Sequence, residues 1–303
     1  MPSAISTANR NLLACSVLVD ELIRCGLRDV CISPGSRSAP LTLAVARRPE
    51  LRRHVHVDER CSAFFALGLA RASGRPVALV CTSGSAAANY HPAVVEAFEA
   101  GVPLLVLSAD RPPRLLDSGA NQTTAQAGLF GPHVLLSEDI GLPRAEAPWL
   151  RWLRSRVERT LELMTGRRPG PVHWNLAFDE PLSAVDVPGD VPPSLMESDP
   201  EAVLGRRDGG PFAPWTRTHR GLSPGDRAEL LALLSSSDRG LVVAGPLDAD
   251  PPTADALGRF AAAWGAPLVA DPLSGLRAQP GVLGAMDAVA RAPELVGLRP
   301  GWV

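Results

Sequence analysis

The sequence has no lysine, because all 30 of its lysine-plus-arginine positions are arginine. This absence excludes Schiff-base chemistry on a lysine amine and the lysine of a phosphate-binding P-loop. Arginine codons are rich in G and C, so a base-composition bias of the gene accounts for the pattern. Any carboxylate that this protein binds through a long basic side chain must therefore be bound by arginine.

Other familiar signals are also missing. The five cysteines form no CxxC pair, which is typical of reduced thiols rather than of a disulfide framework. No HExxH-type metal spacing and no GxSxG elbow occurs, so we assign no metal ligands. No signal-peptide pattern or apolar run of ~18 residues is present. We therefore expect a soluble, cytoplasmic protein with no membrane span. The net charge of −2 gives no reason to expect a nucleic-acid partner.

The 303 residues are enough for two domains. Residues 1–182 alternate short apolar runs with helix-like segments, which predicts an α/β fold with a parallel sheet covered on both faces. Residues 183–222 are rich in proline and have no sustained period, so we expect a linker. A second βα pattern, at 223–303, is short, and we expect an incomplete second α/β domain there.

Polar side chains follow each predicted strand, where ligands of open parallel sheets bind. Glu59 comes directly after the apolar run at 54–57. One interpretation is a solvated strand end paired with arginine. The other is an acid half-buried at the sheet rim, which shares a proton with a ligand nitrogen.

The small residues at 82–89 enter a helix after the next strand, and they include Ser85 and Asn89. Such a turn suits the approach of a ligand to backbone amides at a helix N-terminus, although a tight βα turn looks the same. It is not a GxGxxG fingerprint.

Two arginines, Arg37 and Arg111, follow other strands of the predicted sheet. Ser36 precedes the first, and Asn121 and Gln122 come shortly after the second. The rigid guanidinium fork matches carboxylates, so this set fits a substrate with several carboxyl groups. Taken singly, each arginine is equally consistent with a surface salt bridge.

Together these segments resemble a known family, the thiamine-diphosphate synthases of menaquinone biosynthesis that make 2-succinyl-5-enolpyruvyl-6-hydroxy-3-cyclohexene-1-carboxylate. The likeness is dense over residues 8–182 and looser over 266–279. It rests on four motifs in order: SPGSRSAP, DER, SADRPP and GANQ.

The resemblance implies a pyrimidine-binding domain, in which Glu59 would protonate N1′ of thiamine diphosphate, with Ser85 and Asn89 near the pyrimidine. Ser85 stands where threonine is common in the family. Ser36, Arg37, Arg111, Asn121 and Gln122 would bind substrate carboxylates and hydroxyls. The reaction implied is decarboxylation of 2-oxoglutarate and addition of the succinyl carbanion to isochorismate, in a homo-oligomer whose active site lies between subunits.

One departure from the family is large. The family holds the diphosphate and Mg²⁺ on a third domain, through a Gly-Asp stretch and a later Asn, and no such segment is recognisable here. We therefore expect that this chain alone neither binds the cofactor tightly nor converts the substrates. Two rivals stay open: a non-catalytic remnant or interaction protein, and another thiamine-diphosphate-dependent decarboxylase, against which SPGSRSAP and GANQ argue.

Overall fold

The computed structural model describes residues 5–214, 221–247, 251–293 and 299–303. Contacts divide the chain into two units, residues 1–216 and 217–303. The sequence pattern instead predicts a first domain that ends at residue 182 and a linker at 183–222, part of which lies outside the described residues. Its division into functional domains stays a prediction.

The first unit is built on a six-stranded, fully parallel sheet with the order β2-β1-β3-β4-β6-β5. The chain runs from β1 outward to β2 and then returns past β1 to form β3, so the winding reverses between β1 and β3. At such a switch point the loops diverge and leave room for a ligand. The strands are β1 (Asp29–Ile32), β2 (Arg52–Val55), β3 (Val77–Cys81), β4 (Leu104–Asp110), β5 (Leu136–Gly141) and β6 (Val172–Ala177).

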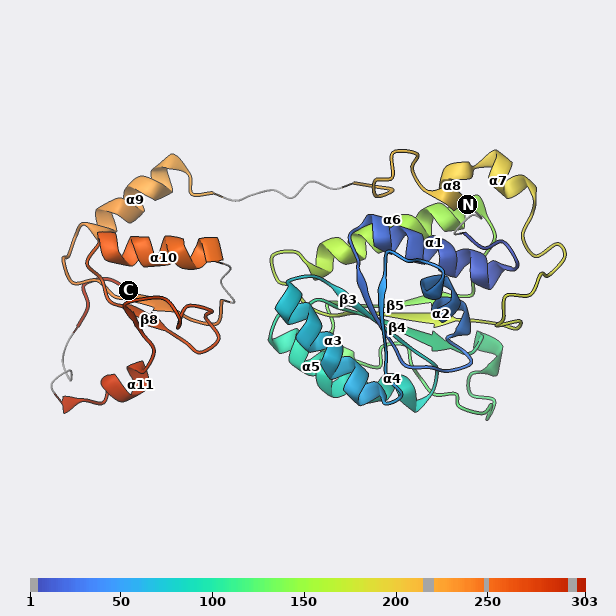
Figure 1. The fold of residues 1–303 in the computed structure, drawn as a ribbon, viewed down its shortest axis with the longest axis horizontal. Coiled ribbons are helices and arrows are strands. Elements are labelled where there is room, and N and C mark those ends of the chain that lie inside the picture. The colour runs from blue at the N-terminus through green and yellow to red at the C-terminus, as the bar shows by residue number, and fades with distance from the viewer. Residues whose placement is uncertain (1–4, 215–220, 248–250, 294–298) are drawn as a thin grey trace. The chain divides into compact units, whose positions relative to one another are not determined.

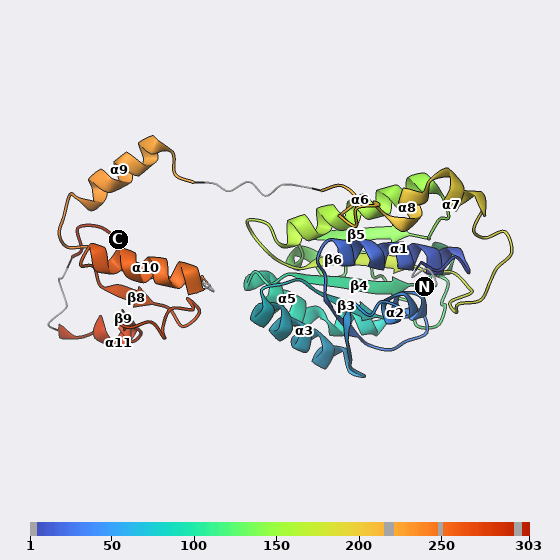
Figure 2. The same ribbon diagram turned by 45° about the horizontal axis from the view of Figure 1, so that its top comes forward.

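Helices cover both faces of this sheet, as Figures 1 and 2 show. On one face lie α1 (Arg10–Arg24), α2 (Ala39–Ala46) and α6 (Ala147–Met164). On the other lie α3 (Glu59–Ser73), α4 (Ser85–Asn89) and α5 (His91–Glu99).

The central strands are apolar on both faces because each face packs on helices. Along β3, Ala78 and Val80 join the core beneath α1 and α6, whereas Val77, Leu79 and Cys81 join the core beneath α3 and α5. This alternation follows from the two-residue period of a strand. The two cores together fix the loops at the carboxyl ends of β1, β3 and β4.

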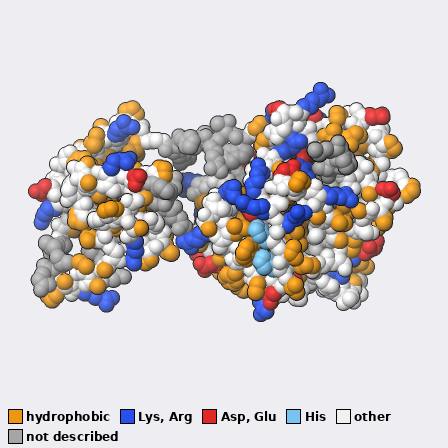
Figure 3. Space-filling model, viewed as in Figure 1, with side chains coloured by type: hydrophobic (Ala, Val, Ile, Leu, Met, Phe, Trp, Pro, Cys, Tyr) orange, Lys and Arg blue, Asp and Glu red, His pale blue; other side chains and the backbone are white. Residues whose placement is uncertain are grey.

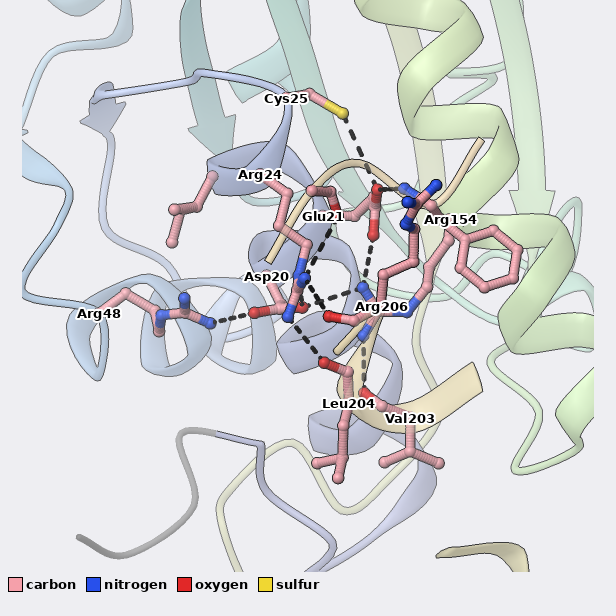
Figure 4. A network of polar contacts seen from close by, with 12 residues as sticks. Asp20, Glu21, Arg24, Cys25, Arg48, Arg154, Val203, Leu204 and Arg206 are labelled. Atoms are coloured by element: carbon pink, nitrogen blue, oxygen red, sulfur yellow. Dashed lines mark hydrogen bonds and ion pairs between the residues drawn. The ribbon is translucent and has the colours of Figure 1, made fainter. Parts of the chain in front are cut away.

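A buried ion-pair network fastens the segment after β6 to this unit (Figure 4). That segment contains α7 (Ser194–Ser198) and α8 (Pro200–Leu204). Arg154 of α6 is fully buried and donates to Asp20 at 2.9 Å and to Glu21 at 2.5 Å. It also donates to the carbonyls of Ala202 and Val203, at 3.0 and 2.7 Å. One guanidinium therefore connects α1, α6 and α8.

The second unit has a three-stranded parallel sheet in the order β7-β8-β9. Its strands are β7 (Val242–Ala244), β8 (Leu268–Ala270) and β9 (Val282–Leu283). Its helices are α9 (Pro224–Leu234), α10 (Pro251–Ala263) and α11 (Met286–Val289). Ser223 and Asp226 form a capping box that starts α9, with Pro224 at its first position.

The predicted α/β class is confirmed, as a six-stranded parallel sheet and a small second parallel sheet. The sequence pattern does not predict β5, β9, α7 or α8. β5 is an edge strand whose apolar pattern is interrupted by the consecutive polar residues Ser137, Glu138 and Asp139, and α7 and α8 are short and lie among prolines. In the described part of the chain no helix is both long and apolar enough to cross a membrane.

Candidate active site

The carboxyl ends of β1 and β3 meet at the switch point of the sheet. Gly35, in the loop after β1, lies so close to Thr82 that a Cβ added there would sit 2.3 Å from the Thr82 Cβ. Only glycine fits this approach. The loop at 33–38 and the turn at 82–85 are therefore in direct contact, as the sequence analysis expected of strand ends that converge on one rim.

Glu59 is the first residue of α3, beside this contact, and it is partly buried. Its neighbour Asp58 caps the helix and accepts a hydrogen bond from the backbone N–H of Arg60 at 2.9 Å. The Arg60 guanidinium also binds Asp58, at 2.6 Å, and lowers the pKa of Asp58 to about 2. Within the described ranges no hydrogen bond or ion pair reaches the Glu59 carboxylate. Arg60 thus pairs with Asp58, and the Glu59 carboxylate stays available to a ligand.

The surroundings of Glu59 place its carboxylate toward the end of β3. Burial raises the pKa of Tyr90 and of Cys81, and the negative charge of Glu59 raises both further. The Tyr90 hydroxyl donates to the Val80 carbonyl at 3.0 Å and lies 3.3 Å from the Ser33 hydroxyl. The buried Cys81 thiol and the fixed Tyr90 hydroxyl therefore lie near the carboxylate.

The cysteines differ sharply in their environments. Cys61, in the first turn of α3, is exposed. Burial raises the pKa of each of the other thiols, to about 12 for Cys31 and well above the usual range for Cys15, Cys25 and Cys81. These four thiols are protonated and unreactive at neutral pH.

Arg37 and Arg111 lie near each other on the same rim. Arg37 donates to the Phe178 carbonyl at 2.9 Å, and its Nε is buried with no partner in the described structure. Arg111 donates to the Gln122 carbonyl at 2.8 Å. Burial lowers the pKa of Arg111, and the nearby charge of Arg37 lowers it further. Arg37 also pairs with the exposed Glu180 carboxylate, at 3.4 Å, so one carboxylate already lies beside these guanidinium groups. The two neighbouring guanidinium groups are suited to bind an anion that displaces Glu180.

Gln122 joins the loop after β4 to the turn after β3. It adopts a left-handed backbone conformation, with φ of 55°, and its side-chain amide donates to the Ser83 carbonyl at 2.9 Å. Gln122 is thereby fixed near Arg111. Its role in substrate binding stays a prediction.

The remaining predicted residues occupy the same rim without fixed partners. Ser36, Ser85 and Asn121 are exposed, and Asn89 is partly exposed at the end of α4. Their side chains make no hydrogen bonds to residues that the structure describes, so they are free to contact a ligand. Their assignment to cofactor or substrate stays a prediction.

Two buried amides of this site escaped the sequence analysis. Gln126 and Asn175 lie beneath the rim and hydrogen-bond to each other at 3.0 Å. Asn175 ends a strand that was predicted, and Gln126 lies four residues after Gln122, but no local pattern marks either as part of a polar network.

For metals, the described ranges contain no group of three or more histidine, cysteine, aspartate or glutamate residues that could hold an ion.

Comparison with known proteins agrees with this geometry. Residues 14–129 match the family "Thiamine pyrophosphate enzyme, N-terminal TPP binding domain". A 2-succinyl-5-enolpyruvyl-6-hydroxy-3-cyclohexene-1-carboxylate synthase of Haloarcula marismortui is 48% identical over 285 residues, which are 92% of this chain and 47% of the relative.

Synthases of the same name from other organisms are also similar. The protein of Roseiflexus sp. is 45% identical over 92% of this chain and 48% of the relative. That of Natronomonas pharaonis is 41% identical over 96% of this chain and 52% of the relative. The chain thus spans about half the length of the curated relatives it matches. It is a homologue of the 2-succinyl-5-enolpyruvyl-6-hydroxy-3-cyclohexene-1-carboxylate synthases over that half, and its first unit carries a thiamine pyrophosphate enzyme N-terminal domain.

Proposed function

We propose that this chain supplies the pyrimidine-binding half of the active site of a thiamine-diphosphate-dependent synthase. The complete enzyme decarboxylates 2-oxoglutarate and adds the succinyl carbanion to isochorismate. The observation that carries the proposal is the unpartnered Glu59 carboxylate at the switch point of the sheet. The names of the relatives give the product, 2-succinyl-5-enolpyruvyl-6-hydroxy-3-cyclohexene-1-carboxylate, and their similarity to this chain supports the proposal.

The residues around Glu59 fit the aminopyrimidine half of the cofactor. When bound, thiamine diphosphate supplies a group that stabilises a carbanion. Glu59 is placed to hydrogen-bond a ring nitrogen of the pyrimidine, because no arginine among the described residues pairs with its carboxylate, which lies near the buried Tyr90 and Cys81. The contact between Gly35 and Thr82 brings two loops together beside it and shapes this end of the site.

Both proposed substrates carry carboxylates, and the rim offers arginines to bind them. Arg37 and Arg111 orient a carboxylate, and binding relieves their mutual repulsion. Gln122, fixed by its bonds to Arg111 and Ser83, presents its backbone and side chain beside that carboxylate.

The described residues do not fit Mg²⁺. No acidic cluster able to hold a metal occurs among them, so we derive no step through the metal from this chain. We propose that the metal, and the diphosphate that it neutralises, are held by another domain in a partner subunit.

The surface beside Glu59 supports this arrangement. Val57 is 90% exposed and Val55 63% exposed, and Phe64 and Phe65 of α3 are about half exposed. Figure 3 shows hydrophobic, basic and histidine side chains together on the visible surface of the first unit. Large apolar side chains gathered next to a candidate catalytic acid are typical of a surface that another domain covers.

The test uses a protein that joins this chain to the remaining segment of a relative. We expect it to consume 2-oxoglutarate and isochorismate only when thiamine diphosphate and Mg²⁺ are present. Glu59→Gln should lower kcat by roughly 100-fold or more, since general acid–base catalysis contributes that much. Asp58→Asn is the matched control, because it keeps the helix cap and should change kcat little.

Equal activity of Glu59→Gln and the parent enzyme would remove Glu59 from the mechanism. For the chain as given, calorimetry should detect no tight binding of thiamine diphosphate. Tight, Mg²⁺-dependent binding would contradict the absence of a diphosphate site. A joined protein that binds no cofactor would favour the interaction-protein alternative.

A further inference from the structure

Gln126 is a fully buried glutamine that links the sheet to the turn after β3. Its side-chain oxygen accepts a hydrogen bond from the backbone N–H of Gly84 at 2.7 Å. Its side-chain nitrogen donates to the Ala109 carbonyl at 3.1 Å and to the Asn175 side-chain oxygen at 3.0 Å. The Gln126 side chain, which is 1% exposed, takes part in each of these three hydrogen bonds.

The partners determine how this amide is oriented. The Gly84 N–H can only donate and the Ala109 carbonyl can only accept, so a flipped Gln126 amide would lose both bonds. The same logic applies to Asn175, whose nitrogen donates to Asp110 at 2.9 Å and whose oxygen accepts from Gln126. The order of donors and acceptors is therefore unique.

These bonds belong to a closed ring that runs through the candidate site. Asp110, which accepts from Asn175, also accepts from the backbone N–H of Arg111 at 2.7 Å. The Arg111 guanidinium donates to the Gln122 carbonyl, and the Gln122 amide donates to the Ser83 carbonyl, next to Gly84. The ring then returns to Gln126.

The turn at Gly84 needs such support. Gly84 has φ of 83° and ψ of −144°, a conformation that only glycine adopts readily. A Cβ at this position would lie 2.9 Å from Cγ of Gln122. The Gly84 backbone thus fits closely against Gln122, and the bond from Gln126 holds it there.

We propose that Gln126 is a positioning residue, which sets the spacing between the turn that begins α4 and the arm formed by Arg111 and Gln122. The proposal rests on the proposed function, in which the turn lies at the cofactor and the arm binds substrate. Gln126 itself is buried and touches neither. It acts by holding Gly84 and, through Asn175 and Asp110, the backbone of Arg111.

The first experiment needs no cofactor. Hydrogen–deuterium exchange is measured on the 303-residue chain with Gln126→Met, which keeps the volume of the side chain and removes its donor and acceptor. We expect exchange in peptides covering 83–89 to accelerate at least tenfold, with the β1 and β3 peptides unchanged. Thr124→Val, an exposed position in the same loop, is the matched control and should exchange like the parent chain.

The second experiment measures kinetics in the joined enzyme, with active-site titration to correct for any unfolded fraction. Gln126→Met should raise the KM for 2-oxoglutarate about tenfold, whereas a merely structural residue would reduce the active fraction and leave KM unchanged.

Unchanged exchange at 83–89 overturns the proposal, as does faster exchange with an unchanged KM. If the unmodified joined enzyme does not turn over these substrates, the proposed function fails, and the positioning role fails with it. Faster exchange in that case would still confirm that Gln126 protects the turn, so the two failures can be told apart.

Discussion

Replacing Arg154 with methionine should destabilise the first unit by about 3–5 kcal/mol, the usual cost of breaking a buried ion pair by removal of one partner. Arg154 is 0% exposed and binds two carboxylates and two carbonyls. Asp20 keeps its bonds to Arg24 and Arg48, at 2.7 and 2.8 Å. Glu21 keeps no arginine in the described structure, so most of the cost comes from its buried, uncompensated charge.

Arg151→Met is the matched control on the same helix. Arg151 pairs with Asp199 at 2.6 Å, but its side chain is 45% exposed. Exposed pairs contribute less than about 1 kcal/mol, because solvent screens them and side-chain entropy opposes them. A second variant, Arg154→Met with Glu21→Gln, should recover part of the loss by removing the unpaired charge.

Urea-dependent hydrogen exchange in peptides from β3, β4 and β6 isolates the unfolding of this unit from that of the second unit. Limited proteolysis follows the segment at 205–214, which Arg154→Met should expose. Equal destabilisation by Arg154→Met and Arg151→Met would refute the argument. A double variant no more stable than Arg154→Met would show that Glu21 is not the source of the cost.

Two further predictions concern the sheet and its rim. Burial lowers the pKa of His173 to about 4, below its usual 6.5, so the unfolded chain binds a proton more readily between these values. Stability should therefore fall by about 3 kcal/mol as pH decreases from 6.5 to 4, and urea midpoints across this range should depend much less on pH in His173→Gln. Gly35→Ala should cost about 1–3 kcal/mol through its clash with Thr82, measurable by the same unfolding assay. The control Gly68→Ala, with nothing within 4 Å on α3, should stabilise by about 0.5–1 kcal/mol, and a similar result for both would contradict the close contact.

The strands that sequence patterns predicted well are those buried on both faces. β3 reads as an uninterrupted apolar run because helices cover it on either side. β5 was missed because Ser137, Glu138 and Asp139 interrupt its apolar pattern, and an edge strand needs less apolar surface. Local composition thus predicted the centre of the sheet better than its edge.

In the candidate site, sequence motifs indicated residues at the strand ends and missed the buried amides beneath them. Arg37, Arg111 and Gln122 lie in loops that follow strands, and ligands of open parallel sheets bind at the carboxyl ends of the strands. The bond from Gly84 to Gln126 joins segments 42 residues apart, and no pattern in either segment requires it. Arg154 is another example, because α8 buries it, and α8 lies in a stretch that its prolines marked as irregular.

The contrast between the exposed Cys61 and the four less accessible thiols gives the chain a natural site for chemical labelling. Thiol reagents at neutral pH should modify Cys61 alone, two residues after Glu59 and on the helix that carries Phe64 and Phe65. A fluorophore attached there would sit on the surface that we propose another domain covers. Its emission would then report assembly of the active site directly, without turnover and without any engineered residue.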